Sequence, residues 1–231
     1  MSETNQDRKR TALFFAGTDT DVGKTFTASL IAQWFHQHGP GPVGVYKPVA
    51  SGCRRDGSQL VADDAVKLWQ AAGCPRTLHE VCPQRFKAPL APTQAARLEG
   101  KSVDLGLLRS GAQCWESESE PLIIEGAGGL MSPLADGVLN IDLAKQFDGI
   151  KLIVVAANRL GVIHQTLATC AAAKLAGLPP AGVILCQVER EADQSTERNA
   201  DEIRRYTDVP LLGSVGYGAV SDDVAFAGKL L

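Results

Sequence analysis

Short apolar segments alternate with segments of helical periodicity along most of the chain. Runs of mainly apolar residues predict buried strands at 12–16, 43–46, 122–125, 152–157, 182–186 and 210–215. Segments whose apolar residues recur every three or four positions predict helices at 25–38, 61–72, 94–98, 105–115, 162–175 and 195–206. Continuous apolar strands that alternate with helices are typical of a parallel sheet covered on both faces. We therefore predict an α/β fold with a mostly parallel sheet and helices on both faces.

Three segments do not follow this alternation. The polar segment 1–10 predicts a disordered tail, and residues 11–231 are expected to form a single domain. Residues 74–92 are rich in proline, which predicts an irregular loop with a function. Residues 221–231 contain no motif that predicts a structure. Because ligands of parallel sheets bind at the carboxyl ends of the strands, the residues that follow each strand are the candidates for chemistry.

Composition and charge narrow the class of protein. Of the 231 residues, 45% are hydrophobic and 21% are charged, as in ordinary globular proteins. The net charge of −3 leaves no domain-wide basic field, which argues against a nucleic-acid partner. The longest apolar run after the first strand, 152–157, is too short for a membrane span, and the chain is expected to be cytoplasmic. The six cysteines show no CxxC spacing and predict reduced thiols.

A glycine-containing loop follows the first predicted strand and leads into a helix. It reads Gly17-Thr-Asp-Thr-Asp-Val-Gly23-Lys24-Thr25, although the general phosphate-loop pattern has a glycine at the position of Thr18. Such a loop turns its backbone N–H groups inward at a helix N-terminus, where the potential favours phosphate. We therefore predict a fold similar to the P-loop nucleoside triphosphatases, with Lys24 at the outer phosphates and the Thr25 hydroxyl on magnesium.

Three further charged residues stand where strands or helices begin or end. Glu125 closes an apolar strand, and Asp64 begins a helix, so both are candidate magnesium ligands. Lys47 follows a strand, where an ammonium group can stabilise a transferring phosphoryl group. Simpler interpretations stay open at this point. The helix dipole stabilises an acidic side chain in a first helical turn even when no ligand is bound. A lysine such as Lys47 is also common on a solvated surface.

Taken together, these motifs resemble those of the dethiobiotin synthetase family. The resemblance rests on the phosphate loop 17–25, on Tyr46-Lys-Pro-Val-Ala-Ser-Gly52 and on Glu125-Gly-Ala-Gly-Gly-Leu-Met-Ser-Pro-Leu134. It extends in order and spacing from about residue 12 to residue 215, and Asp64 stands where the family has a metal-binding aspartate.

The resemblance implies a ligase of biotin biosynthesis that uses ATP and magnesium. Its substrate would be 7,8-diaminononanoate and its carbon source CO2. One amine would form a carbamate, whose oxygen attacks the γ-phosphate to give a carbamic–phosphoric anhydride. The second amine would then close the cyclic urea, and the products would be dethiobiotin, ADP and phosphate. The family is also a homodimer with the diamine at the subunit interface.

The same resemblance implies roles for individual residues. Lys24 and Lys47 would be catalytic, and magnesium would be held by Thr25, Asp64 and Glu125. The implied nucleotide contacts are Asp21, Val22, Gly23, Lys24, Thr25, Phe26, Glu125, Gly128, Gln187 and Val215. The implied substrate contacts are Thr20, Lys47, Ser51, Gly126, Ala127, Gly128, Gly161 and His164. His164 stands near a turn where the family often has asparagine.

The nucleotide-base site departs from the family pattern. Well-known members place an asparagine, whose amide reads adenine, after the strand at 182–186. This chain has Cys186 and Gln187 there, and Gly216-Tyr217-Gly218 replaces a proline–aromatic pair. We therefore predict that ATP is used with weak discrimination against other nucleoside triphosphates.

Two other classes of protein share such a phosphate loop. An amide synthetase of the cobyrinic acid type also activates an oxygen by phosphorylation, but the 231 residues are not expected to hold its glutaminase domain, which a separate subunit would have to supply. ATP-switched dimers position DNA or carry metal clusters, and they need a basic patch or cysteine ligands that this composition does not suggest. Both remain alternatives to the synthetase.

Overall fold

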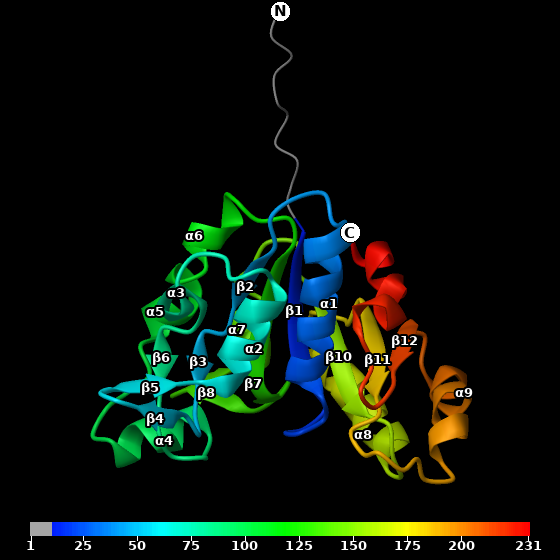
Figure 1. Ribbon diagram of the computed structural model, residues 1–231. Helices are drawn as coiled ribbons and strands as arrows, with labels where there is room; N and C mark the ends of the chain where they lie inside the picture. The colour runs from blue at the N-terminus through cyan, green and yellow to red at the C-terminus, as the bar shows by residue number, and fades with distance from the viewer. Residues whose placement is uncertain (1–10) are drawn as a thin grey trace, which may run out of the picture.

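A six-stranded parallel sheet forms the centre of the computed structural model, which describes residues 11–231 (Figure 1). The spatial order of its strands is β12–β11–β10–β1–β7–β2. They are β1 (Ala12–Gly17), β2 (Gly44–Tyr46), β7 (Leu122–Gly129), β10 (Lys151–Ala157), β11 (Gly182–Cys186) and β12 (Leu211–Val215). Every predicted strand is therefore present, and the prediction of a parallel sheet is confirmed. The predicted disorder of residues 1–10 lies outside the described residues.

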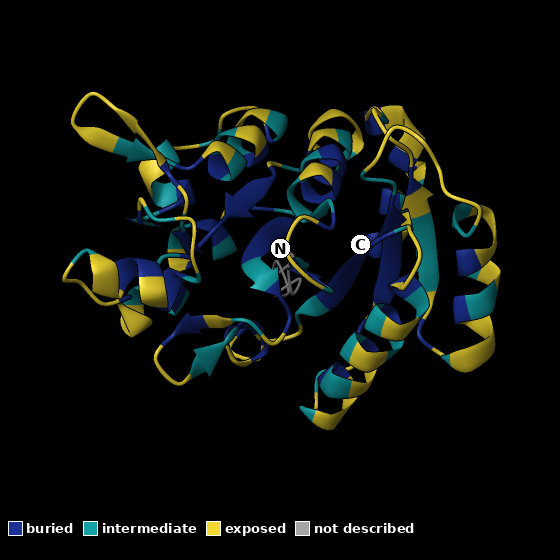
Figure 2. Ribbon diagram, turned by 90° about the horizontal axis from the view of Figure 1, so that it is seen from below, coloured by how far each residue is buried: buried dark blue, intermediate teal, exposed yellow. Residues whose placement is uncertain are grey.

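Helices cover both faces of this sheet, as predicted. The longer ones are α1 (Lys24–His38), α2 (Asp63–Ala71), α8 (Val162–Leu175), α9 (Thr196–Tyr206) and the 3₁₀ helix η1 (Ser221–Leu230). Figure 2 shows α1, α2 and η1 on one face and α8 on the other. Helix η1 packs along α1, so the segment without a readable motif completes the cover of the phosphate-loop helix. No helix within residues 11–231 is long and apolar enough to cross a membrane.

The segments between β2 and β7 differ from the prediction. Residues 74–92 are not wholly irregular, because they contain α3 (Leu78–Val81) and β6 (Gln84–Arg85), and β6 pairs with β3 (Val49–Ala50). The predicted helix 105–115 is two helices, α5 (Leu105–Ser110) and α6 (Gln113–Glu116), after α4 (Pro92–Leu98). The break falls at Gly111, because the Tyr46 hydroxyl donates to the carbonyls of Leu107 at 2.8 Å and Leu108 at 3.2 Å. The Ala112 N–H then bonds the Arg109 carbonyl at 3.2 Å and not the Leu108 carbonyl. Contact with β2 therefore interrupts a continuous helical pattern.

Two small antiparallel hairpins and one short helix were not predicted. The hairpins are β4 (Arg54–Asp56) with β5 (Gln59–Val61), and β8 (Pro133–Ala135) with β9 (Val138–Leu139). Helix α7 (Asn140–Ala144) follows β9 directly. Strands of two or three residues are too short to show an alternating pattern, which explains why the sequence did not reveal them.

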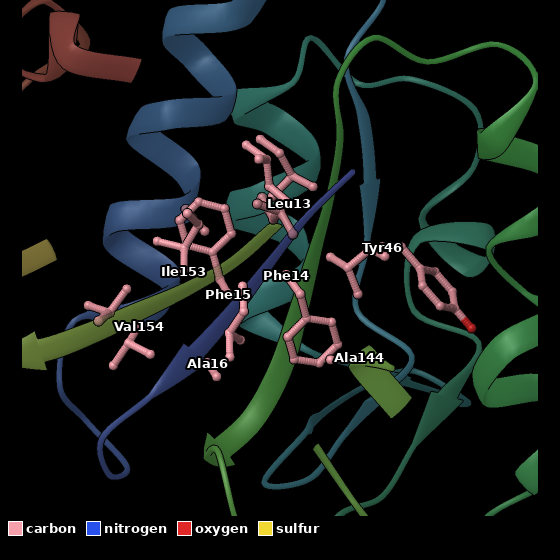
Figure 3. Close-up of a cluster of buried hydrophobic side chains, with 14 of the residues drawn as sticks. Leu13, Phe14, Phe15, Ala16, Tyr46, Ala144, Ile153 and Val154 are labelled. Atoms are coloured by element: carbon pink, nitrogen blue, oxygen red, sulfur yellow. The ribbon is translucent and has the colours of Figure 1, made fainter. Parts of the chain in front are cut away.

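The core lies on both sides of β1. Phe14 and Phe15 project to opposite faces of this strand, as expected from the two-residue period of a strand (Figure 3). Both side chains are fully buried, and each contributes about 1.5–3 kcal/mol of hydrophobic stabilisation. β1 pairs with β10 on one edge and with β7 on the other, so the loop that follows it starts at the centre of the sheet.

Candidate functional site

The phosphate loop between β1 and α1 is shaped by close contacts at two glycines. A Cβ on Gly17 would lie 2.4 Å from the Asp19 carbonyl oxygen, whereas the neighbouring Thr18 donates its backbone N–H to Val155 at 2.9 Å. The steric need for glycine therefore lies one residue before the position that the general pattern names. Gly23 caps α1 in the left-handed region with φ of 83°, and a Cβ there would lie 2.3 Å from Cys186 Sγ.

A buried carboxylate gathers the candidate catalytic side chains at the carboxyl ends of β1, β2 and β7. The oxygen Oε1 of Glu125 accepts from Lys47 Nζ at 2.7 Å, from Thr25 Oγ1 at 2.7 Å and from Lys24 Nζ at 3.2 Å. Glu125 is fully buried and Lys47 is 3% exposed. The interpretation of Lys47 as a solvated surface lysine is therefore wrong, because its ammonium group lies against this carboxylate.

The two lysines differ in their protonation energetics. Burial lowers the pKa of Lys24 below its ordinary value, and attraction to Glu125 offsets only part of that effect. Burial also acts against the charge on Lys47, but Glu125 and Asp64 together outweigh it and raise the pKa of Lys47. Asp64 attracts Lys24 as well, but Lys24 lies farther from Glu125 than Lys47 does and is repelled by Lys47, which explains the opposite directions of the two pKa shifts. Lys47 is thus held as a cation throughout the neutral pH range.

Asp64 joins the same cluster from the first turn of α2. Its Oδ2 lies 3.4 Å from Lys47 Nζ, and its side chain is 49% exposed. Burial opposes its ionisation, but Lys47 and Lys24 together lower the pKa of this carboxyl group below its ordinary value. Asp64 is therefore an ionised carboxylate that faces the cluster, which favours a site role over a purely helix-stabilising one.

The donor set suits a magnesium ion that also binds phosphate. Glu125 Oε2 is buried and has no hydrogen-bond partner among the described residues, a state that a cation or a water would relieve. No group of three histidine, cysteine or acidic residues in 11–231 forms a complete metal site. Magnesium normally takes only one or two carboxylates and completes its shell with waters and phosphate oxygens, so Thr25, Asp64 and Glu125 fit that pattern.

A cleft of about 1010 Å³ opens over this cluster. Its volume lies at the upper end of the range for small-molecule sites and can hold a nucleotide beside a second small molecule. The cleft is lined by the predicted residues Thr20, Asp21, Gly23, Lys24, Thr25, Phe26, Lys47, Ser51, Asp64, Ala127, Gly128 and Gln187. The structure thus brings together residues from positions 20 to 187 of the chain.

Six predicted site residues do not line the cleft. Glu125 is one of them, because it is fully buried at the centre of the lysine cluster. Val22, Gly126 and Val215 are buried next to the cleft but do not line it. Gly161 and His164 are exposed at the amino-terminal end of α8, outside the cleft of their own chain.

Several lining residues were not predicted as contacts. Pro89, Leu90, Ala91 and Pro92 form an apolar wall, so the end of the proline-rich segment does reach the site. Ser132 and Pro133 follow the glycine run of β7, and Cys186, Val188, Tyr217 and Gly218 lie at the ends of β11 and β12. For residues 89–92, the clustering of prolines in the sequence was the signal that could have predicted the contact. The positions of residues 132–133 and of the residues at the ends of β11 and β12 depend on turns that only the folded chain defines.

The sheet order, the phosphate loop and the lysine–carboxylate cluster define a P-loop nucleoside triphosphatase fold. Solved structures agree in fold: a ParA family ATPase from Chlorobium tepidum has a TM-score of 0.56 at 12% identity and covers 96% of this chain and 91% of its own. FlhF complexed with GMPPNP/Mg²⁺ has a TM-score of 0.55 at 12% identity and covers 96% of this chain and 73% of its own.

Sequence relatives identify the family. The family model described as "AAA domain" matches residues 11–224. An ATP-dependent dethiobiotin synthetase BioD from Rhodopirellula baltica is 46% identical over 213 residues, which cover 87% of this chain and 82% of the relative. The enzyme of the same name from Anaeromyxobacter dehalogenans is 38% identical over 197 residues, which cover 84% and 85%. The chain belongs to the ATP-dependent dethiobiotin synthetase family.

Proposed function

We propose that the protein carboxylates and cyclises 7,8-diaminononanoate with CO2 to dethiobiotin, in a reaction that consumes ATP and requires magnesium. The observation that carries this proposal is the buried Glu125, which holds Lys24, Lys47 and Thr25 at the end of a phosphate loop. This cluster stands in a cleft large enough for a nucleotide and a second substrate. The family membership supplies the identity of that substrate.

The two lysines are the groups that stabilise phosphoryl transfer. Attack of a carbamate oxygen on the γ-phosphate forms a new O–P bond and breaks the bond to ADP, and charge builds on the phosphoryl oxygens. Ammonium groups preorganised by Glu125 lie ready for that charge, so little reorganisation is needed during the step. Lys47 stays protonated and acts as a fixed positive charge rather than as a base.

Thr25, Asp64 and Glu125 would hold the magnesium ion. Bound there, the ion would neutralise phosphate charge and polarise the transferred group. Glu125 would offer its unpartnered Oε2, and Asp64 is already ionised by its lysine neighbours.

The remaining lining residues suit an aliphatic diamine and its carbamate. Ser51 and Thr20 offer hydroxyl groups, and Ala127 and Gly128 line the cleft beside the phosphate loop, where a Cβ on Gly128 would lie 3.5 Å from Thr20 Oγ1. Leu90 and its proline neighbours can cover an alkyl chain. After phosphorylation, attack of the second amine on the carbamate carbon closes the cyclic urea and releases phosphate.

The base end of the cleft supports weak nucleotide discrimination. The side-chain nitrogen of Gln187 already donates to the carbonyls of Glu189 at 3.1 Å and Arg190 at 3.4 Å. Cys186 cannot supply the paired donor and acceptor of an amide. Tyr217, 57% exposed at the rim, offers an aromatic face on which any base can stack. Turnover with ATP, GTP and CTP tests this, and an ATP preference above about a hundredfold, or roughly 2.7 kcal/mol, overturns it.

A homodimer through α8 is part of the proposal. Hydrophobic residues occur on all sides of this helix, yet one side faces solvent, including Ala168, Ala171 and the 90% exposed Leu175. Helices that are apolar all round are normally buried, which favours a second copy of the chain on this face. Gly161 and His164 begin the same helix, so the dimer would place them near the partner's substrate, where a helix N-terminus suits a carboxylate.

Phosphate release from ATP and magnesium tests the reaction, measured with and without 7,8-diaminononanoate and bicarbonate. We expect release to depend on the diamine and the product to have the mass of the cyclic urea. Hydrolysis that ignores the diamine would contradict the proposed substrate and favour the ATP-switched alternative. Ammonia-dependent amide formation on a carboxylate would favour the amide synthetase.

A further inference from the structure

The regular pairing of β7 with β1 is interrupted immediately after Glu125. Phe15 of β1 pairs with Glu125 of β7, but Gly17, only two residues later, pairs with Gly129. Two extra residues are therefore accommodated on β7 within 126–128, as in a β-bulge. This bulge brings Ala127 and Gly128 to the wall of the cleft.

The bulge deprives Ala127 of its strand partner, and the side chain of Asn140 takes that place. The Ala127 N–H donates to Asn140 Oδ1 at 3.0 Å, and Asn140 Nδ2 donates to the Ala127 carbonyl at 2.8 Å. The same nitrogen donates to the carbonyls of Gly129 at 2.8 Å and Ser132 at 3.1 Å. One amide thus mimics a strand neighbour and spans the whole turn.

Two further observations show that Asn140 is tightly packed against this segment. Asn140 is fully buried, and a buried amide that lost these partners would be costly. A Cβ on Gly126 would lie only 2.2 Å from Asn140 Oδ1, so the amide occupies the space that any other residue would need. Asn140 begins α7 and hydrogen-bonds no phosphate-loop residue itself. The segment that it holds meets that loop outside the bulge, through the Leu130 N–H, which donates to the Gly17 carbonyl at 2.9 Å.

We propose that Asn140 is a positioning residue for the diamine, because it holds the Gly126–Ser132 segment (126–132) in the shape that forms the substrate wall. This inference rests on the proposed function, since it assigns the wall at Ala127 and Gly128 to the diamine or its carbamate. It predicts that loss of the amide disturbs the diamine site more than the nucleotide site.

Asn140→Ala tests this, with Asn199→Ala as a matched control. Asn199 is also buried, and its Nδ2 donates to Asn158 Oδ1 at 2.9 Å, Ser195 Oγ at 3.1 Å and the Arg159 carbonyl at 3.4 Å, none of which lines the cleft. We expect Asn140→Ala to raise the KM for the diamine at least about tenfold and to change the Kd for ATP less than about threefold. Asn199→Ala should leave both constants unchanged while losing comparable thermal stability.

Hydrogen exchange of segment 126–132, measured without ligand, gives a readout that does not depend on the substrate. It should accelerate in Asn140→Ala and not in Asn199→Ala. Unchanged exchange, an unchanged diamine KM, or equal changes in the diamine and ATP constants would overturn the positioning role. If Asn140→Ala does not fold, Asn140→Ser, which keeps one donor, serves with the same criteria. A wild-type protein without diamine-dependent release would overturn the proposed function, whereas the exchange result alone decides whether Asn140 holds the segment.

Discussion

Two helices of this protein begin in the same way and serve different ends. Helix α1 follows β1 and helix α8 follows the adjacent β10, and each is capped by a glycine in the left-handed region, Gly23 with φ of 83° and Gly161 with φ of 95°. Neither helix has a side-chain cap, so no capping side chain occupies the first backbone N–H groups of either helix. Only α1 lies in the cleft.

The difference comes from what surrounds each turn. A Cβ on Gly23 would meet Cys186 Sγ at 2.3 Å, whereas a Cβ on Gly161 would meet nothing within 4 Å. Lys24 and Thr25 open α1 and reach Glu125, whereas Val162 and Ile163 open α8 with apolar side chains. A helix N-terminus alone is therefore not a phosphate site. Enclosure by neighbouring strands and a set of preorganised charges make it one.

The glycine pair offers the largest expected contrast. Gly23→Ala combines left-handed strain with overpacking against Cys186, together about 4 kcal/mol, and should weaken ATP binding about a thousandfold. Gly161→Ala meets open space and should cost only about 1–2 kcal/mol of stability, with ATP affinity unchanged. Titration calorimetry and thermal unfolding measure both. Similar ATP affinities in the two variants would contradict the role of enclosure.

Loss of one preorganised charge should have the next largest effect. Lys47→Ala removes a buried cation from Glu125 and should lower turnover by roughly 10²–10³-fold, with ATP binding largely intact. Lys67→Ala is the control, because this exposed lysine lies one turn after Asp64 on the same helix. Steady-state rates and nucleotide titrations separate the two variants. Near-normal turnover of Lys47→Ala would remove this lysine from the mechanism.

The carboxylate at the centre of the cluster should control the metal requirement. Glu125→Gln keeps the size of the side chain but removes the charge that faces two lysines and a threonine. We expect the magnesium concentration for half-maximal turnover to rise by about 10–100-fold, the scale seen when a metal site loses support. A magnesium titration that matches the wild type would show that Glu125 is not a ligand.

The apolar face of α8 gives the smallest and most local effect. Ala171→Glu places a charge on this exposed face and should shift the molecular mass from dimer to monomer in light scattering. ATP binding should persist because the phosphate loop lies on α1. Ala225→Glu, at an exposed position of η1 on the sheet face opposite α8, should leave the mass unchanged. A wild-type monomer, or a dimer that tolerates Ala171→Glu, would move the interface elsewhere.

Sequence patterns predicted the frame of the molecule well because its elements are local in origin. Each strand of the central sheet is a continuous apolar run, and the phosphate loop is a contiguous motif whose glycines and lysine can be recognised without a fold. The prediction failed for elements that depend on a contact with a distant part of the chain. The helix breaks at Gly111 because the Tyr46 hydroxyl contacts the backbone of that turn. The two-residue strands are too short to show a periodicity of their own.

The sequence by itself determined the parallel α/β frame, the phosphate loop and the candidate side chains at the strand ends. It determined them because hydrophobic period and turn chemistry act within a few residues. Only the tertiary structure decided that Lys47 is buried on Glu125, that Gly161 and His164 lie outside the cleft of their own chain, and that Asn140 completes the bulge of β7. These outcomes depend on contacts between residues far apart in the chain, whose distances no local pattern encodes.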